Sequence, residues 1–426
     1  MPKLIPTLVA AALSAAAASA VLAAPAAAMA APATVSARHH HGSSGSPRGD
    51  QPSSQCLAAS NRRYRAVPWA QRQLAAARVW SLTQGAGQLV AVVDSGVSGT
   101  AAGLAGAVLP GRDILTGGSG DSDCLGHGTF TAGLIAARPT PGTGLVGVAP
   151  QARILPVDVV NPAEDESSDP VTSSSAVAAG ISYAVKAGAS VIDVSTAATP
   201  GPSLALSQAI AYAEARNVVV VAPVSTSDGT NPANVVSYPA AYPGVIAVAA
   251  VDSSGAPLNA AGRNARVDLA APGDGLTSIG PRGPGDISGN GAALATAFVA
   301  GTAALVRSYY PNLSAAQVGQ RLELTADQPG TALPNPEVGY GIVDPYTALT
   351  TVLPQESGGQ APAVPPAPAI HLPPQVPPDT WPLTAALIVC GLVLGGLLTG
   401  GIVVHITRHG RRNGWRSSFS PRSPGG

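Results

Sequence analysis

The chain has 426 residues, of which 46% are hydrophobic and only 11% are charged. Its 23 basic and 23 acidic side chains cancel, so the composition gives no indication of a nucleic acid or another polyanion as partner. The length exceeds that of a typical single domain, although α/β enzymes of about 250 residues often fold as one unit.

The first 30 residues have the pattern of a secretory signal. Lys3 precedes an apolar, alanine-rich run from Leu8 to Leu22, and Ala28-Met29-Ala30 matches a cleavage site of small residues. A membrane anchor is the alternative, but the strongly apolar part of the segment is short. We therefore expect residues 1–30 to be removed.

Residues 31–65 form the expected N-terminal extension. The three histidines at positions 39–41 lie among Ser and Gly and have no second cluster that would complete a metal site. We expect a solvated tail there, and neither a metal nor another cofactor in the protein.

Two of the three cysteines, Cys56 and Cys124, lie in the part of the chain that the signal would direct outside the cell. Disulfides persist there, and as the only pair these two residues are expected to form one bridge. It would join the N-terminal extension to the loop at Cys124. Two free thiols are the alternative.

Apolar, β-branched runs alternate with helical stretches between residues 66 and 353, the expected globular domain. The predicted strands are Gln88–Val93, Arg153–Val160, Ser190–Val194, Asn217–Val221 and Val245–Ala250, and the predicted helices between them are Ser174–Ala187 and Ser203–Arg216. This alternation predicts an α/β fold, a doubly wound parallel sheet with helices on both faces. In such sheets the functional site lies at the carboxyl ends of the strands, and Asp94 directly follows the first strand.

Two further helices are expected near the end of this domain. Ala292–Tyr309 is apolar nearly all round, which indicates a buried central helix. Ser314 is placed to cap the start of a helix over Ala315–Leu324.

The C-terminal region predicts a membrane anchor. Residues 354–380 are rich in proline and favour an extended linker. Leu383–Val404 carries no charge and is long enough to cross a bilayer, with Trp381 at its start and Arg408, Arg411, Arg412 and Arg416 after its end. We expect a single transmembrane helix over residues 381–406, a cytoplasmic tail over residues 407–426, and the globular domain outside the cytoplasm.

Two motifs in the globular domain indicate nucleophilic chemistry. Asp94 lies in V-A-V-V-D-S-G-V, and His127 lies in G-H-G-T-F-T-A-G. A serine nucleophile needs an imidazole to take its proton, and the imidazole needs a carboxylate to fix its tautomer. His127 is the only histidine between Gly42 and Ile370, so it is the one candidate base. The glycines on both sides of His127 suggest close approach of a substrate backbone.

These motifs resemble the aspartate and histidine motifs of the subtilases, over about Val67–Leu349. Other segments resemble those of the mycosins, the subtilases associated with type VII secretion. These segments are Pro68-Trp69-Ala70-Gln71-Arg72 and Val338–Pro345, together with Cys124 beside the histidine motif, the proline-rich linker and the C-terminal span. The resemblance implies a subtilisin-like peptidase fold, with Asp94 and His127 as catalytic residues. It also implies subunits of a type VII secretion membrane complex as partners.

The motif for the nucleophile departs from the family. The family pattern G-T-S-x-(A/S) falls on Gly291–Ala295, which puts Ala293 at the serine position. Thr226 stands where the family has an asparagine that donates to the oxyanion, and Ser195-Thr196-Ala197 replaces S-L-G. In a subtilisin, loss of the serine costs about 10⁶-fold in kcat, and loss of the asparagine costs roughly 10²–10³-fold.

These departures favour a pseudoprotease with a role in binding or assembly. The alternative is an active serine endopeptidase that cleaves secreted proteins, with Ser288 or Thr296 as nucleophile, or with its native serine replaced by alanine in this chain. Neither Ser288 nor Thr296 shares the position of Ala293, and a misplacement near 1 Å costs about 10²-fold. A single replaced serine would not explain Thr226 and Ala197 as well. A peptide could still occupy the groove.

Overall fold

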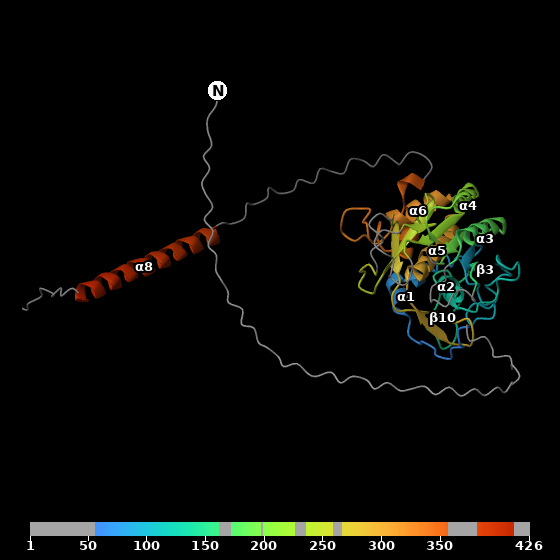
Figure 1. Cartoon of the computed structure of the whole chain (residues 1–426), viewed down its shortest axis with the longest axis horizontal. Coiled ribbons are helices and arrows are strands. Elements are labelled where there is room, and N and C mark those ends of the chain that lie inside the picture. Colours follow the sequence, from blue (N-terminus) through green and yellow to red (C-terminus); the bar gives the residue numbers. More distant parts are fainter. Residues whose placement is uncertain are drawn as a thin grey trace, which may run out of the picture. The chain divides into compact units, whose positions relative to one another are not determined.

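The computed structural model describes residues 56–161, 172–196, 199–225, 236–258, 266–356 and 381–412 (Figure 1). The expected signal segment, the N-terminal extension before Cys56, most of the proline-rich linker and residues 413–426 of the expected cytoplasmic tail lie outside the described residues.

The core of the domain is a seven-stranded sheet in which every neighbouring pair of strands is parallel. Its order is β2-β3-β1-β4-β6-β8-β9. The strands are β1 (Leu89–Asp94), β2 (Arg112–Asp113), β3 (Arg153–Asp158), β4 (Val191–Val194), β6 (Val219–Pro223), β8 (Val245–Val251) and β9 (Leu269–Pro272). Strand β1 lies between β3 and β4, so the sheet extends in both directions from it. This is the switch point at which doubly wound sheets form their sites.

The five strands predicted from the sequence are β1, β3, β4, β6 and β8, within a few residues of the expected bounds. Two strands of the sheet are not among those predicted from the sequence, β2, which is only two residues long, and β9. Two small antiparallel pairs also lie outside the main sheet, β5 (Thr199–Pro200) with β7 (Ser237–Tyr238), and β10 (Leu276–Ile279) with β11 (Asp286–Gly289).

Helices cover both faces of the sheet, as the α/β prediction requires (Figure 1). One face packs against α2 (His127–Ala136), α5 (Ala292–Tyr309) and α6 (Ala315–Leu324), with α1 (Trp69–Leu74), η1 (Ala76–Val79) and α7 (Pro345–Thr350) around them. The other face packs against α3 (Ser174–Lys186) and α4 (Leu204–Ala215). Alternate residues of each strand enter the two separate cores.

Helix α5 is the buried central helix that its composition predicted. Every residue from Ala292 to Val306 is buried. The helix is apolar and long enough to cross a membrane, but 83% of it is buried inside the domain. Helix α6 begins at the predicted cap, where the Ser314 side chain accepts a hydrogen bond from the Gln317 amide and the Gln317 side chain accepts one from the Ser314 amide.

The start of the described chain runs along the β10–β11 hairpin. The Gly285 amide donates to the Ser60 carbonyl at 2.8 Å, and the Asp286 amide donates to the Arg62 carbonyl at 2.6 Å. The Tyr64 amide in turn donates to the Asp286 carboxylate at 2.8 Å. The N-terminal extension is therefore part of the domain's hydrogen-bonded structure from Cys56 onward.

The last described segment is α8 (Trp381–Arg412), an apolar helix that is a candidate membrane span. Its described side chains are exposed, in contrast to those of α5.

Candidate active site

Asp94 and His127 meet at the carboxyl end of the sheet. Asp94 is the last residue of β1, and His127 is the first residue of α2. The Nδ1 atom of His127 lies 2.8 Å from Oδ2 and 2.9 Å from Oδ1 of Asp94. Asp94 is fully buried, and His127 is 8% exposed. An imidazole held in this way through Nδ1 has a fixed orientation and can take up a proton at Nε2.

The two glycines beside His127 allow α2 to begin at this point. Gly126 has a left-handed φ of 85°, and a Cβ atom on it would come within 2.7 Å of the Leu57 side chain. A Cβ atom on Gly128 would lie 2.0 Å from the carbonyl oxygen of Gly96, which follows β1. Other parts of the chain therefore lie close to both glycines, and the approach of a substrate backbone stays a prediction.

Three further groups donate hydrogen bonds to the Asp94 carboxylate. The Ser95 amide lies 2.7 Å from Oδ1, the Ser195 hydroxyl 2.5 Å from Oδ2, and the Thr131 hydroxyl 3.4 Å from Oδ2. Ser195 follows β4, the strand beside β1, so the order of the sheet brings it to Asp94. The sequence identified Ser195 only as the first residue of the segment that replaces S-L-G, and did not predict its contact with Asp94.

A second buried carboxylate, Asp123, stabilises the turn that leads into α2. It accepts hydrogen bonds from the Ser95 hydroxyl at 3.0 Å and the Gly126 amide at 2.7 Å. The amide and hydroxyl of Thr129 also donate to it, at 2.8 and 2.7 Å. Burial raises the pKa of Asp123 to about 6, although these hydrogen bonds oppose the shift.

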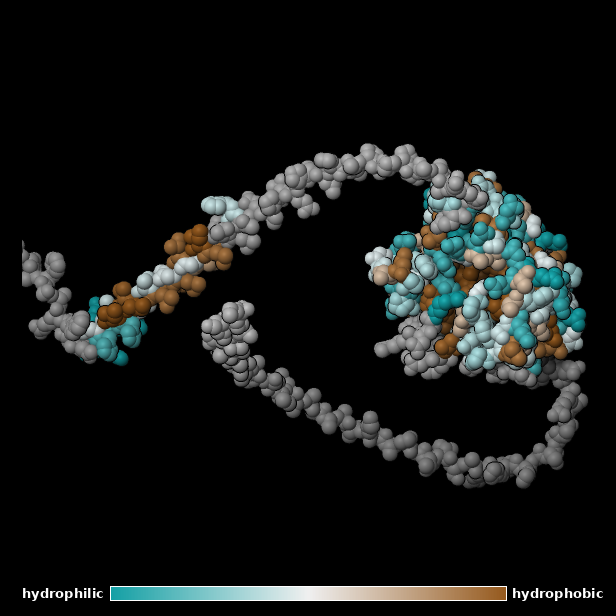
Figure 2. Space-filling view, turned by 90° about the horizontal axis from the view of Figure 1, so that it is seen from above, coloured by the Kyte–Doolittle hydropathy of each residue, from teal (hydrophilic) through white to brown (hydrophobic). Residues whose placement is uncertain are grey.

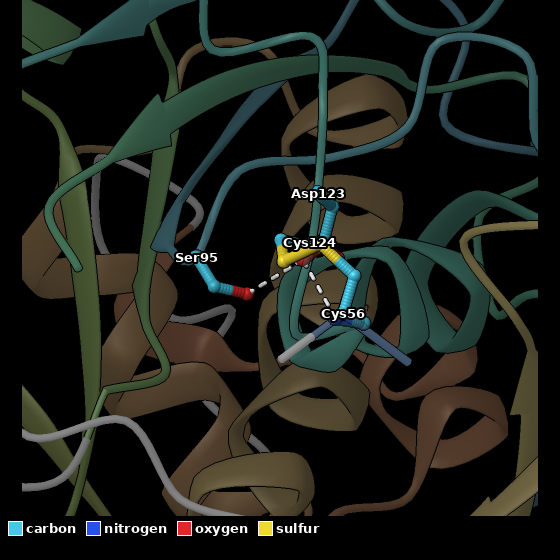
Figure 3. Close-up of a disulfide and its surroundings, with 5 residues drawn as sticks. Cys56, Ser95, Asp123 and Cys124 are labelled. Carbon is cyan, nitrogen blue, oxygen red and sulfur yellow. Dashed lines mark hydrogen bonds between the residues drawn. A yellow bond between two sulfur atoms is a disulfide. The ribbon is translucent and has the colours of Figure 1, made fainter. Parts of the chain in front are cut away.

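The next residue, Cys124, forms a disulfide with Cys56 (Figure 3). The Leu57 amide also donates to the Cys124 carbonyl at 2.8 Å. Figure 3 shows the disulfide beside Asp123 and Ser95, whose side chains are hydrogen-bonded to each other. The N-terminal extension is thus covalently joined to the turn that holds His127.

A third buried carboxyl group is that of Asp193, which belongs to β4 and lies two residues before Ser195 in the chain. It is fully buried, and its Cα is paired with Val92 of β1 and Val221 of β6. Neither carboxylate oxygen has a hydrogen-bond partner of good geometry among the described residues. Burial raises the pKa of Asp193 to about 8, against the opposing effects of the nearby Thr296 hydroxyl and His127. The group is therefore mainly uncharged at neutral pH.

An acidic cavity of about 580 Å³ lies next to the Asp94–His127 pair, lined by residues that include Ser95, Asp113, Leu125 and Asp158. Burial raises the pKa of Asp158 to about 7, and the nearby carboxylates of Asp113, Asp123 and Asp94 add to the shift. The Asp158 carboxyl group therefore holds its proton more readily than a solvent-exposed aspartate does.

Ala293 is the second residue of α5 and is fully buried. The Thr296 hydroxyl, also fully buried, donates to the Ala293 carbonyl at 2.6 Å. Ser288 lies in strand β11 and is exposed. Thr226, expected at the oxyanion position, and Ala197 lie outside the described residues. Within the described ranges, no three His, Cys, Asp or Glu side chains are grouped so that they could hold a metal ion.

Comparison with known proteins agrees with this geometry. Residues 85–341 match the Subtilase family. Over 393 residues the chain is 33% identical to Mycosin-1 of Mycolicibacterium smegmatis, covering 79% of this chain and 86% of that protein. The crystal structure of MycP1 from Mycobacterium smegmatis superposes with a TM-score of 0.61 at 29% identity, over 75% of this chain and 93% of that one.

A chain in the structure of an intact ESX-5 inner membrane complex also superposes, with a TM-score of 0.59 at 27% identity, over 83% of this chain and 95% of that one. The fold, the matched family and the extent of the alignments lead to the same assignment. The chain belongs to the subtilase family, and its relatives include the mycosins.

Proposed function

We propose that this protein is a membrane-anchored, catalytically impaired subtilase that serves as a structural or binding component of a type VII secretion complex. The observation that carries this proposal is the contrast between the Asp94–His127 pair and Ala293. The pair has a hydrogen-bonded geometry from which an imidazole can activate a hydroxyl, whereas Ala293, which the sequence motif places at the family's serine position, has only a methyl group.

The environment of the two alternative nucleophiles supports loss of activity. The Thr296 hydroxyl is buried in α5 and donates its proton to a carbonyl within the helix. Ser288 belongs to the β10–β11 hairpin, where its Cα is paired with Thr277. A nucleophile must lie within about 3 Å of the base, and neither residue shares the backbone position of Ala293.

The alternative function is an active serine endopeptidase that cleaves secreted proteins. Its supporting observation is the hydrogen-bonded network around Asp94, in which Ser95, Ser195 and Thr131 all hold the carboxylate. However, the same network stabilises the junction between β1, β4 and α2, so its presence does not require proteolysis.

The proposed place of this protein in type VII secretion is supported by its similarity to relatives. Mycosin-1 aligns over most of both chains, and an ESX-5 inner membrane complex contains a chain of the same fold. The apolar helix α8 would anchor the domain at the membrane in which such a complex assembles. The proposed topology places the domain outside the cytoplasm, with the C-terminus inside.

Two experiments on the full-length chain separate the functions. A fluorophosphonate probe should leave the wild-type protein unlabelled, and stoichiometric labelling within residues 287–298 would establish an active protease. In cells that lack the gene, an Asp94→Asn/His127→Gln variant should restore type VII secretion as the wild type does. Loss of secretion by a variant that still folds and co-purifies with the membrane complex would contradict the non-catalytic role.

A further inference from the structure

The C-terminal end of α8 carries basic side chains that the proposed function does not use. The helix runs without interruption from Trp381 to Arg412, 32 residues or about 48 Å at the rise of an α-helix. The apolar stretch Leu383–Val404 spans about 33 Å, which already matches the roughly 30 Å hydrocarbon core of a bilayer. Residues 405–412 therefore continue as helix at the depth of the lipid head groups.

Four of these residues lie on one face of the helix, which we call the basic face: His405, Arg408, His409 and Arg412. Their spacing of three and four residues places them above one another. The rings of His405 and His409 are stacked, with centroids 6.1 Å apart and planes inclined by 10°. Figure 2 shows the consequence, a helix that is brown along most of its length and teal at its C-terminal end.

The basic face has no acidic counterpart on its own helix. Residues 381–412 contain no Asp or Glu. The ion pairs found among the described residues involve other parts of the chain, and none reaches Arg408 or Arg412. The guanidinium group pairs with phosphate oxygens in a bidentate manner, and phosphates are most concentrated at this depth of a membrane. An acidic protein would have to bring carboxylates to a layer that lipid phosphates already occupy.

We propose that the basic face of α8 binds the phosphate-containing head groups of anionic phospholipids. The charge of the face matches these lipids, and its position directly after the apolar stretch sets the depth of contact. The continuous helix keeps the two arginines on the same side, so that both can engage lipids on one side of the anchor.

The test is native mass spectrometry of the full-length protein in detergent with equal amounts of phosphatidylglycerol and phosphatidylcholine. The wild-type chain should retain phosphatidylglycerol in preference. The preference should fall by roughly fivefold for each arginine removed in an Arg408→Gln/Arg412→Gln variant. Added inorganic phosphate at millimolar concentration should not displace the lipid, which separates a head-group site from a general phosphate site.

The matched control is an Arg65→Gln/Arg153→Gln variant, which removes the same charge from exposed positions of the globular domain. It should keep the wild-type preference. Equal retention of both lipids by the wild type, or equal loss in the two double variants, would overturn the proposal. So would an unchanged lipid preference in the Arg408→Gln/Arg412→Gln variant together with loss of a co-purifying acidic protein, because the face would then belong to a protein partner.

Discussion

The Nδ1 atom of His127 lies within 2.9 Å of both carboxylate oxygens of Asp94, and a hydroxyl group from the next strand, that of Ser195, holds the same carboxylate. The Asp94 carboxylate, at the end of β1, is thus held by groups from α2 and from the residue that follows β4. The proposed defect is therefore confined to the nucleophile and the oxyanion position.

Restoring the serine alone should give little peptidase activity, and adding the oxyanion residue should give more. Ala293→Ser should supply a hydroxyl for His127 to activate, but Thr226 stands where the family pattern has its asparagine donor, and loss of that donor costs about 3 kcal/mol in transition-state stabilisation. Thr226→Asn addresses that deficit, so the double variant should turn over a peptide substrate faster than the single variant. Initial rates on a fluorogenic peptide, with fluorophosphonate labelling, measure both.

The control for this rescue is His127→Ala in the double variant, which should abolish labelling. Turnover typical of an active subtilisin from Ala293→Ser alone would show that Thr226 or a backbone amide already completes the oxyanion site. Absence of labelling in the double variant would show that a serine at position 293 is out of reach of His127.

Removing the disulfide should destabilise the domain. Cys56 and Cys124 are separated by 68 positions, and closing a loop of that size contributes roughly 4 kcal/mol in the entropic description, with measured values often lower. A Cys56→Ser/Cys124→Ser variant should therefore unfold at lower denaturant concentration. Denaturation of the full-length chain measures the loss, and Cys390→Ser in α8 is the control that should leave the midpoint unchanged.

If the double variant unfolded at the wild-type midpoint, the disulfide would not stabilise the folded domain. Two free thiols in the purified wild-type protein, detected by mass spectrometry without reduction, would contradict the bridge itself.

Replacing Asp193 should stabilise the domain at neutral and alkaline pH. Burial raises the folded-state pKa of this carboxyl from 3.8 to about 8, so the folded state holds a proton that the unfolded state releases above pH 4. The contribution of Asp193 to the free energy of unfolding is therefore most favourable below about pH 4, and it is lost progressively as the pH rises to about 8. The full shift corresponds to at most about 6 kcal/mol.

The Asp193→Asn variant should consequently be more stable than the wild type at pH 8, and the gain should shrink toward pH 4. Denaturation midpoints between pH 4 and 9 measure this difference. The stability of the variant should still decline somewhat as the pH rises, because the pKa values of Asp158 and Glu323 are each raised to about 7, chiefly by burial. Asp274→Asn, at an exposed position, is the control. An equal gain at every pH would contradict the role of ionisation.

Arg321 should be essential for the stability of the domain's C-terminal end. Its side chain is 1% exposed and forms an ion pair with Glu356. It donates to the carbonyl oxygens of Ala348 and Thr351 at 2.6 and 3.0 Å, and its guanidinium lies over the Tyr310 ring at 4.2 Å. Arg321→Met removes one partner of a buried pair, which costs about 3–5 kcal/mol.

Chemical denaturation of the full-length chain measures this cost. The control is Arg153→Met, because Arg153 is exposed at the start of β3 and its replacement should change the free energy of unfolding by no more than about 0.5 kcal/mol. Similar midpoints for the two variants would show that the Arg321 contacts contribute little net stability.

The regular elements were predictable because their signals are local. Apolar β-branched runs identified β1, β3, β4, β6 and β8, and a continuous apolar pattern identified α5. Strand β9 was missed because Leu269–Pro272 is short and rich in alanine, so that only pairing with β8 makes it a strand. Similarly, the alternating pattern of the elements predicted a parallel sheet, but not the position of β1 between β3 and β4.

The sequence by itself determined the α/β class, the placement of Asp94 at a strand end and His127 as the one candidate base, since all of these depend on residues close together in the chain. It also predicts that Ala293 stands at the serine position of the family motif. Only the tertiary structure decided that Ser195 holds Asp94, that Asp123 supports the turn before His127, and that Asp193 is buried where its pKa is raised to about 8. The physical reason is that strand order and register choose which distant side chains meet, and burial then sets their protonation.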